Sequence, residues 1–133
     1  MSWNDWLNPI FASDKIDKAA LFSSAGDSLW ANGEGAHALS FEADQIKAIA
    51  GGFADATPLQ ANGIFLGTGA DKDKYFTLRC DDRSIYAKKG KTGIVCVKTK
   101  RALIVAHYGE TVQPGEAAKV AETIADKLIA ATY

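Results

Sequence analysis

Residues 84–108 read SIYAKKGKTGIVCVKTKRALIVAHY and contain three short apolar runs that are joined by two basic turns. The runs SIYAKK, TGIVCVKT and ALIVAHY are rich in β-branched and aromatic residues, which favour strands. KKGKTG is short enough to close a tight hairpin between the first two runs, and KTKR joins the next two. Successive hairpins predict an antiparallel meander.

The same pattern extends the sheet in both directions along the sequence. GIFLG and KYFTLR, which begin after residue 62, read as two further short strands. Residues 19–35, AALFSSAGDSLWANGEG, predict two more strands joined by the turn Ala25-Gly26-Asp27, the second ending at Trp30. A central antiparallel sheet of about six to seven strands is therefore expected.

Two helices are predicted before the central strands. Trp3, Trp6, Leu7 and Ile10 have the spacing of one helical face, with Ser2 placed to cap the helix. A second helix is expected to begin at a Ser40 cap and to end at Gly51-Gly52, and its apolar residues are Phe41, Ile46, Ile49 and Ala50.

A long final helix is predicted to open at Gln113-Pro114-Gly115-Glu116, where proline occupies the first helical position. Its apolar stripe should pack on the sheet, and it consists of Ala117, Val120, Ala121, Ile124 and Leu128. The predicted fold class is α+β, an antiparallel sheet with helices at both ends of the chain.

Length and composition fit one globular domain over residues 1–133, because 47% of the residues are hydrophobic and 23% are charged. No apolar run approaches the roughly 18 residues of a membrane span, and no signal-peptide pattern is visible. Cys80 and Cys96 are few and lack a metal spacing, so reduced thiols in the cytoplasm are expected, with no metal or cofactor.

Charge is divided unevenly between the two halves of the chain. Residues 1–70 carry three lysines and eight acids, whereas residues 71–133 carry twelve basic residues and eight acids. The basic second half could meet an acidic partner, but its excess of +4 is too small and diffuse to indicate nucleic acid.

Signals for catalysis are weak. His37 lies in a Gly/Ala loop, and His107 ends a strand that could neighbour Cys96, although a cysteine in a buried strand is usually inert packing. Gly67-Thr68-Gly69 lacks the Lys-Ser/Thr of a phosphate loop, and Asp81-Asp82 reads as a polar turn rather than a metal site. The chain is not expected to be an enzyme.

The aromatic residues allow two interpretations. For an ordinary helix, Trp3 and Trp6 would form a core stripe. If the first and last helices instead pack side by side on one sheet face, Trp3, Trp6 and Tyr133 could converge beside Trp30. Such a half-exposed row of rings suits a polyproline II helix, because its carbonyls accept hydrogen bonds from indole and phenol groups.

The basic residues of the second half also allow two interpretations. Each lysine by itself reads as part of a solvated strand or turn surface. Together, the hairpin residues Lys88, Lys89 and Lys91 could attract phosphoinositide head groups, while Lys74, Arg79 and Lys119 could face an acidic protein.

Five stretches in family order resemble profilin, the small cytoplasmic protein that binds actin monomers. They are MSW, the SxxGDSLWA pattern at residues 23–31, SIYAKKGKTG, ALIVAHY, and VQPGEAAKVAE with Tyr133. The resemblance covers essentially the whole chain, and SIYAKK and QPGEAA look most like fungal and amoebal profilins. It implies a central antiparallel sheet with the N- and C-terminal helices on one face and smaller helices on the other.

The resemblance also implies two binding surfaces. The poly-L-proline groove would consist of Trp3, Trp6, Trp30, Leu128 and Tyr133. Trp6 replaces the tyrosine that is more common there, and Lys127 stands where many relatives have an aromatic residue or histidine. The actin-binding positions would be Lys74, Arg79, Lys88, Lys89, Gln113, Gly115, Lys119 and Glu122, although the segment GTGADKDKY is longer than in many relatives.

A monomeric two-surface adaptor is therefore expected, one that holds monomeric actin, favours exchange of its nucleotide, and captures proline-rich segments of partners such as formins. Phosphoinositide binding by Lys88, Lys89 and Lys91 would be a secondary activity of this cytoplasmic, cytoskeleton-associated protein. The alternative is a regulatory α+β domain that binds a small molecule, which would require a deep apolar pocket.

Overall fold

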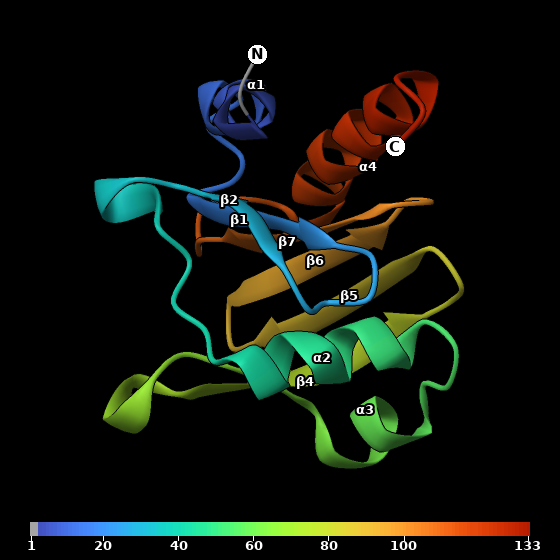
Figure 1. Ribbon diagram of the computed structural model, residues 1–133. Helices are drawn as coiled ribbons and strands as arrows, with labels where there is room; N and C mark the ends of the chain where they lie inside the picture. Colours follow the sequence, from blue (N-terminus) through green and yellow to red (C-terminus); the bar gives the residue numbers. More distant parts are fainter. Residues whose placement is uncertain (1–2) are drawn as a thin grey trace.

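The computed structural model describes residues 3–133, apart from the side chain of Asp71. Its centre is a curled antiparallel sheet of seven strands in the order β2-β1-β7-β6-β5-β4-β3 (Figure 1). The strands are β1 Lys18–Ser23, β2 Leu29–Asn32, β3 Ile64–Leu66, β4 Asp73–Cys80, β5 Ser84–Lys89, β6 Thr92–Lys98 and β7 Ala102–Tyr108. The predicted meander is confirmed, since β4 to β7 pair consecutively.

The central strands are buried on both faces, and alternate residues serve two separate cores. In β7, Ile104 belongs to the core on one face, and Leu103 and Val105 belong to the core on the other. Val95 and Cys96 of β6 divide in the same way. Side chains alternate across a strand, so a continuous apolar run such as ALIV can fill both cores.

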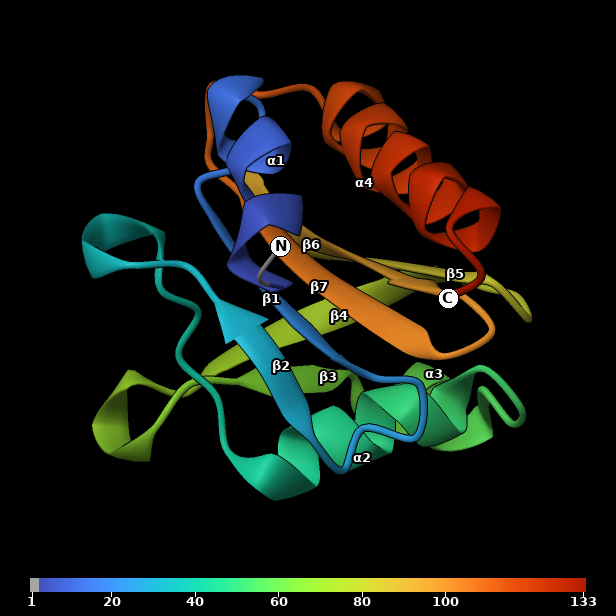
Figure 2. The ribbon, with the colours of Figure 1, turned by 45° about the horizontal axis from the view of Figure 1, so that its top comes forward.

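Helices cover the two faces of the sheet as the resemblance implied. The helical elements are η1 Trp3–Trp6, α1 Asn8–Ala12, η2 Gly35–His37, α2 Ala43–Gly52, α3 Thr57–Asn62, η3 Gly69–Asp71 and α4 Pro114–Ala130. The segments α1 and α4 lie side by side on one face, and α2 and α3 lie on the other (Figures 1 and 2). We call these the α4 side and the α2 side of the sheet.

Two local predictions differ from the structure, and a third cannot be compared with it. The opening helix is divided into η1 and α1, because Pro9 at the start of α1 has no N–H to continue a helix from η1. The predicted cap Ser2 lies outside the described residues. Ser40 is not the cap of α2, which begins after Glu42, whose backbone N–H donates to Gln45 Oε1 at 2.9 Å.

The predicted end of α2 is confirmed, but a further helix follows it that was not expected. The helix α2 ends at Gly52, as predicted, and Gly51 and Gly52 lie in its last turn. A Cβ on Gly52 would lie 2.2 Å from a methyl group of Leu59, so this glycine permits the close packing of α3. The helix α3 was not predicted, since its six residues include Pro58 and are too few to show a period.

None of the helices in the described range, residues 3–133, is long and apolar enough to cross a membrane.

Candidate binding surfaces

Three aromatic rings from distant parts of the sequence meet on the α4 side. The ring centroids of Trp3 and Trp30 lie 4.4 Å apart in a stacked arrangement, and those of Trp3 and Tyr133 lie 4.7 Å apart, edge to face. All three side chains are partly exposed and rest on the core below them. We call Trp3, Trp30 and Tyr133 the aromatic shelf.

A β-bulge aims Trp30 at this shelf. Leu21 of β1 pairs with Ala31 and Phe22 pairs with Leu29, so Trp30 is left without a partner in the ladder. An extra residue in one strand turns its side chain away from strict alternation. Trp30 and Ala31 therefore both contact the core on the α4 side, although they are neighbours in one strand.

The C-terminal end of α4 places Tyr133 beneath Trp3. The N–H of Tyr133 donates to the carbonyl of Leu128 at 2.8 Å, and the N–H of Thr132 donates to that of Ile129 at 3.0 Å. These two bonds form a Schellman motif, in which the residue after the helix cap adopts a left-handed conformation. Thr132 has φ +74°, a conformation that costs free energy for a β-branched residue.

The main-chain oxygen of Tyr133 is held by the β6–β7 turn. It accepts hydrogen bonds from the N–H of Arg101 at 2.5 Å and from Thr99 Oγ1 at 2.9 Å. The final turn of the chain is thus fixed to the sheet as well as to its own helix, and this orders the phenol ring beside Trp3.

The other two predicted groove residues have different positions. Leu128 has 0% exposure and belongs to the core, so it supports Tyr133 from within and offers no surface to a ligand. Trp6 is partly buried on the same core but makes none of the ring contacts that define the shelf. Of the five predicted residues, the structure brings three together, because Trp3 contacts both Trp30 and Tyr133.

A second surface lies where strands β4 and β5 extend beyond α4. Lys74, Phe76, Leu78 and Arg79 of β4 and Lys88 of β5 project from the α4 side there, and we call these five residues the basic sheet face. Phe76 and Leu78 are 64% and 62% exposed, which is unusual for large apolar residues in a strand. The Nζ atom of Lys74 lies 5.4 Å from the centroid of the Phe76 ring.

The first turn of α4 continues the basic sheet face. Gln113 and Gly115 are both exposed, as predicted for a contact surface. Pro114, Gly115 and Leu78 line an apolar depression of about 180 Å³ whose floor includes Tyr86. Basic groups therefore surround an apolar centre, which is the arrangement of a protein-binding surface.

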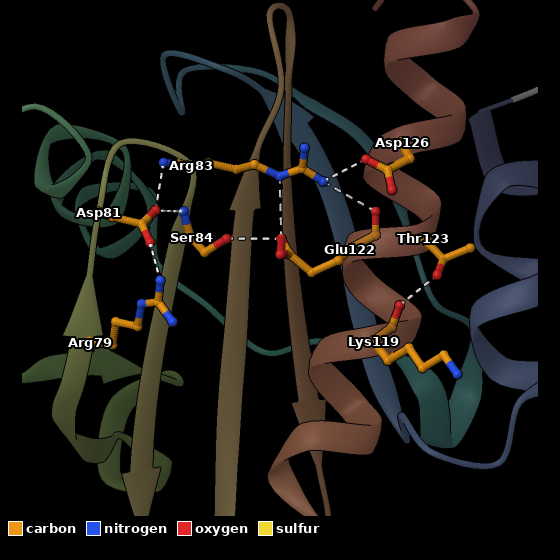
Figure 3. A network of polar contacts seen from close by, with 8 residues as sticks. All are labelled: Arg79, Asp81, Arg83, Ser84, Lys119, Glu122, Thr123 and Asp126. Atoms are coloured by element: carbon orange, nitrogen blue, oxygen red, sulfur yellow. Dashed lines mark hydrogen bonds and ion pairs between the residues drawn. The ribbon is translucent and has the colours of Figure 1, made fainter.

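Three predicted actin-binding residues do not join this face. Lys89 points to the α2 side and forms an ion pair with Asp73. Lys119 lies on a different flank of α4 from Glu122 and Asp126 (Figure 3). It lines a groove there together with Pro9 of α1. Glu122 is engaged within the molecule, since its carboxylate accepts a hydrogen bond from Ser84 Oγ at 2.8 Å.

Arg83 directly precedes β5 and joins the start of that strand to α4 through a polar network (Figure 3). Its guanidinium lies 2.8 Å from Asp126 and 3.4 Å from Glu122, and the hydrogen bond to Asp126 is the main cause of its raised pKa. Asp81 accepts hydrogen bonds from the N–H groups of Arg83 and Ser84, which lower the pKa of its carboxyl group. This network fixes the distance between the basic sheet face and α4.

Phe76, Leu78 and Arg83 were missing from the predicted site. A signal existed for Phe76, because Tyr75 and Phe76 are adjacent in one strand and must point to opposite faces. Tyr75 is buried, and burial raises its pKa to about 12, so Phe76 is the exposed member of the pair. Arg83 could not be found from sequence, since its partners lie about 40 positions away.

The hairpin proposed for phosphoinositides presents its lysines in different directions. Lys88 and Lys89 point to opposite sides of the sheet, and Lys91 lies in the turn after Gly90. All three are exposed, but they do not converge on one point.

The candidate catalytic pair is also separated. Ile94, and not Cys96, lies opposite His107, whose Nδ1 is 2.6 Å from Asp17. Burial raises the pKa of the Cys96 thiol, so the reactive thiolate is disfavoured. Among the residues that the structure describes, no group of three or more His, Cys, Asp or Glu side chains could hold a metal ion.

Comparison with known proteins gives one consistent result. The profilin family model matches residues 1–133. The chain is 42% identical to the profilin of Saccharomyces cerevisiae over 133 residues, with 100% of both chains covered. The solved structure of Schizosaccharomyces pombe profilin superimposes with a TM-score of 0.88 and 41% identity, covering 99% of this chain and 100% of that one.

The fold also matches a more distant structure. A complex of mouse profilin IIa with a double repeat from the FH1 domain of mDia1 has a TM-score of 0.79 over 100% of both chains. Its identity to this chain is 20%, so it is evidence for the shared fold alone.

Proposed function

This chain belongs to the profilin family, and on that premise we propose that it is an adaptor with two separate binding surfaces. The aromatic shelf binds proline-rich segments, and the basic sheet face with the first turn of α4 binds monomeric actin. The adaptor delivers actin monomers to growing filament ends and is not an enzyme. The proposal rests on the contact of the Trp3 ring with the rings of both Trp30 and Tyr133.

Ring geometry supports proline binding. A polyproline II helix has flat pyrrolidine rings and carbonyls with no internal hydrogen bond. Stacked and perpendicular rings at 4.4 and 4.7 Å provide the matching flat surface, and the indole and phenol groups supply donors at its rim. The relevant relative is mouse profilin IIa, which is bound to an FH1 repeat in its solved structure.

The basic sheet face supports binding to an acidic protein such as actin. Apolar residues at its centre, Phe76 and Leu78, can be desolvated by a partner, while Lys74, Arg79 and Lys88 provide positive charge around them. Such charge increases the encounter rate more than the final affinity.

The two surfaces are far enough apart to be occupied together. Gly115 borders one surface at the first turn of α4, and Tyr133 belongs to the other just beyond its last turn. The 17 residues of α4 span about 25 Å at 1.5 Å per residue.

We also propose that the protein binds phosphoinositides and that it has a defined location in the cell. The exposed lysines Lys88, Lys89 and Lys91 support weak attraction to anionic head groups, in competition with actin at Lys88. We place the protein in the cytoplasm, associated with the actin cytoskeleton.

The alternative, a regulatory domain for a small molecule, has less support. Its best candidate is a cavity of about 280 Å³ beside α2 and β3, lined by Ile49, Leu59 and Ile64 together with Asp44 and Lys72. Ligand pockets usually measure about 300 to 1,000 Å³. The shelf is the more distinctive feature.

A titration with deca-proline, followed by tryptophan fluorescence, tests the proposal. We expect saturable binding by the native protein and its loss in Trp3→Ala, while co-sedimentation with monomeric actin bound to beads is unchanged. Leu78→Ala is the matched variant and should show the reverse pattern. Absence of peptide binding by the folded native protein, in fluorescence and in calorimetry, would refute the adaptor.

A further inference from the structure

A groove between α1 and α4 is apolar at its floor and basic at its rim. Pro9 of α1 and Val120 and Ile124 of α4 line the floor, and Lys119 and Lys127 stand on the rim. The groove has a volume of about 240 Å³. It lies on the outer surface of the helix pair that Figure 2 shows side by side.

The groove continues from the aromatic shelf. Lys127 precedes Tyr133 by six residues, so it stands about one turn above the end of α4 where the shelf lies. Trp6 and Pro9 approach from the other side, because η1 leads directly into α1. A chain that leaves the shelf between the two helices therefore passes Lys127 first and Lys119 second.

Both rim lysines are available for a ligand. In the part of the chain that the structure describes, neither ammonium group has an ion-pair partner. The neighbouring acids of α4 are already engaged, since Glu116 pairs with Lys15 at 2.8 Å and Asp126 pairs with Arg83. The rim thus presents positive charge that the protein itself does not compensate.

The opposite side of α1 has a different character. A polar cleft there is lined by Asn4, Asn8, Asn32 and Glu34 among other residues, and its lining includes no lysine or arginine. Glu34 is exposed. Of the two flanks of α1, carboxylates are therefore favoured at the α1–α4 groove and not at this polar cleft.

We propose that the α1–α4 groove selects proline-rich ligands that carry acidic residues at one flank. This inference rests on the proposed function of the shelf. Lys119 and Lys127 are eight residues apart on α4, a rise of about 12 Å. A polyproline II chain covers that distance in about four residues, so two carboxylates at this spacing match both lysines.

The apolar floor and the basic rim of the groove contact different parts of the ligand. Proline rings of the ligand cover Val120 and Pro9, while the acidic flank pairs with the lysines at the solvent edge. Exposed ion pairs contribute little individually, so we expect about two- to five-fold tighter binding for an acidic flank at low salt. The ratio of the affinities for acidic and neutral flanks should fall towards one as salt screens the charges.

Three synthetic peptides test this inference on the full chain. Each contains ten prolines, and the flank carries two glutamates four residues apart, two glutamines at the same places, or two lysines. Dissociation constants are measured by tryptophan fluorescence at low and high salt. We expect the order glutamate, glutamine, lysine from tightest to weakest at low salt, with equal values at high salt.

A pair of charge-matched variants assigns the effect to the groove. Lys119→Gln/Lys127→Gln should reduce the glutamate-to-glutamine affinity ratio to about one, while Lys18→Gln/Lys47→Gln removes the same charge from exposed positions elsewhere and should keep the native ratio. Lys47 is exposed on α2, on the other side of the sheet.

The possible failures are distinguishable. If the glutamine peptide binds and the native ratio is one, or if the ratio survives in Lys119→Gln/Lys127→Gln, the selection by the groove is refuted and the shelf stands. If no peptide binds to the folded protein, the proposed function of the shelf fails and the inference fails with it.

Discussion

The aromatic shelf and the basic sheet face are built from different kinds of contact. The shelf joins Trp3, Trp30 and Tyr133, which are separated by up to 130 positions, and each ring is placed by backbone features: η1, a β-bulge and a Schellman motif. The basic sheet face arises from neighbouring strands β4 and β5, and its side chains are largely exposed.

This difference has consequences for mutation. Changes in the shelf should affect proline binding and packing together, because each ring supports another ring. Changes in the basic sheet face should affect binding alone, because exposed side chains contribute little to stability. Substitutions in each surface test this contrast.

Trp30→Ala removes the ring that stacks on Trp3, the central ring of the shelf. Truncation of an aromatic residue at the centre of an interface costs about 2 kcal/mol or more, so proline affinity should fall by about 30-fold or more. Isothermal titration with deca-proline measures this, and Trp30→Phe, which keeps a flat ring, should lose much less. An equal loss of actin binding in folded Trp30→Ala would show that the surfaces are not independent.

Leu78→Ala tests the apolar centre of the basic sheet face. We expect about a ten-fold loss of actin affinity, while the free energy of unfolding changes by no more than about 0.5 kcal/mol, because the side chain is 62% exposed. Actin co-sedimentation and urea denaturation provide the two values. Ile129→Ala, also an exposed apolar residue, is the control and should bind actin normally.

Lys88→Gln and Lys89→Gln compare two neighbours on opposite sides of β5. Lys88→Gln should slow association with actin by about two- to three-fold at low salt, since Lys88 belongs to the basic sheet face. Lys89→Gln should have a smaller effect, because Asp73 already neutralises Lys89. Stopped-flow measurements across a salt series would contradict this contrast if the two variants behaved alike.

Thr132→Gly tests whether the left-handed conformation of residue 132 positions Tyr133. A left-handed conformation costs a non-glycine residue about 1 to 2 kcal/mol, and glycine loses about 0.5 to 1 kcal/mol in backbone entropy. The variant should therefore gain about 0.5 kcal/mol in the free energy of unfolding and keep proline binding. Thr123→Gly, inside α4, should change stability in the opposite direction.

The fold was largely predictable from sequence. Alternating and continuous apolar runs located all seven strands, and the proline at the start of α4 located that helix, because these signals are local. The η1 break, the Glu42 start of α2 and the helix α3 were missed, since each depends on tertiary packing or on too few residues to show a period.

The binding surfaces were less predictable. Spacing indicated that Trp3 and Tyr133 could meet, but the resemblance to profilins supplied the reason to expect it, and the family assignment is confirmed. The burial of Leu128 and the separation of Lys88 from Lys89 depend on which side of an element each residue faces. The β-bulge at Trp30 leaves no recognisable pattern in the sequence.

The most direct test of the account is a deca-proline titration followed by NMR on the folded protein. Trp3 and Trp30 indole N–H signals and the Tyr133 ring signals should shift together with one dissociation constant, while amides of Lys74 to Arg79 stay in place. Shifts confined to the strands β4 and β5, or unchanged indole signals at saturating peptide, would contradict the claim that residues from both ends of the sequence form one proline-binding surface.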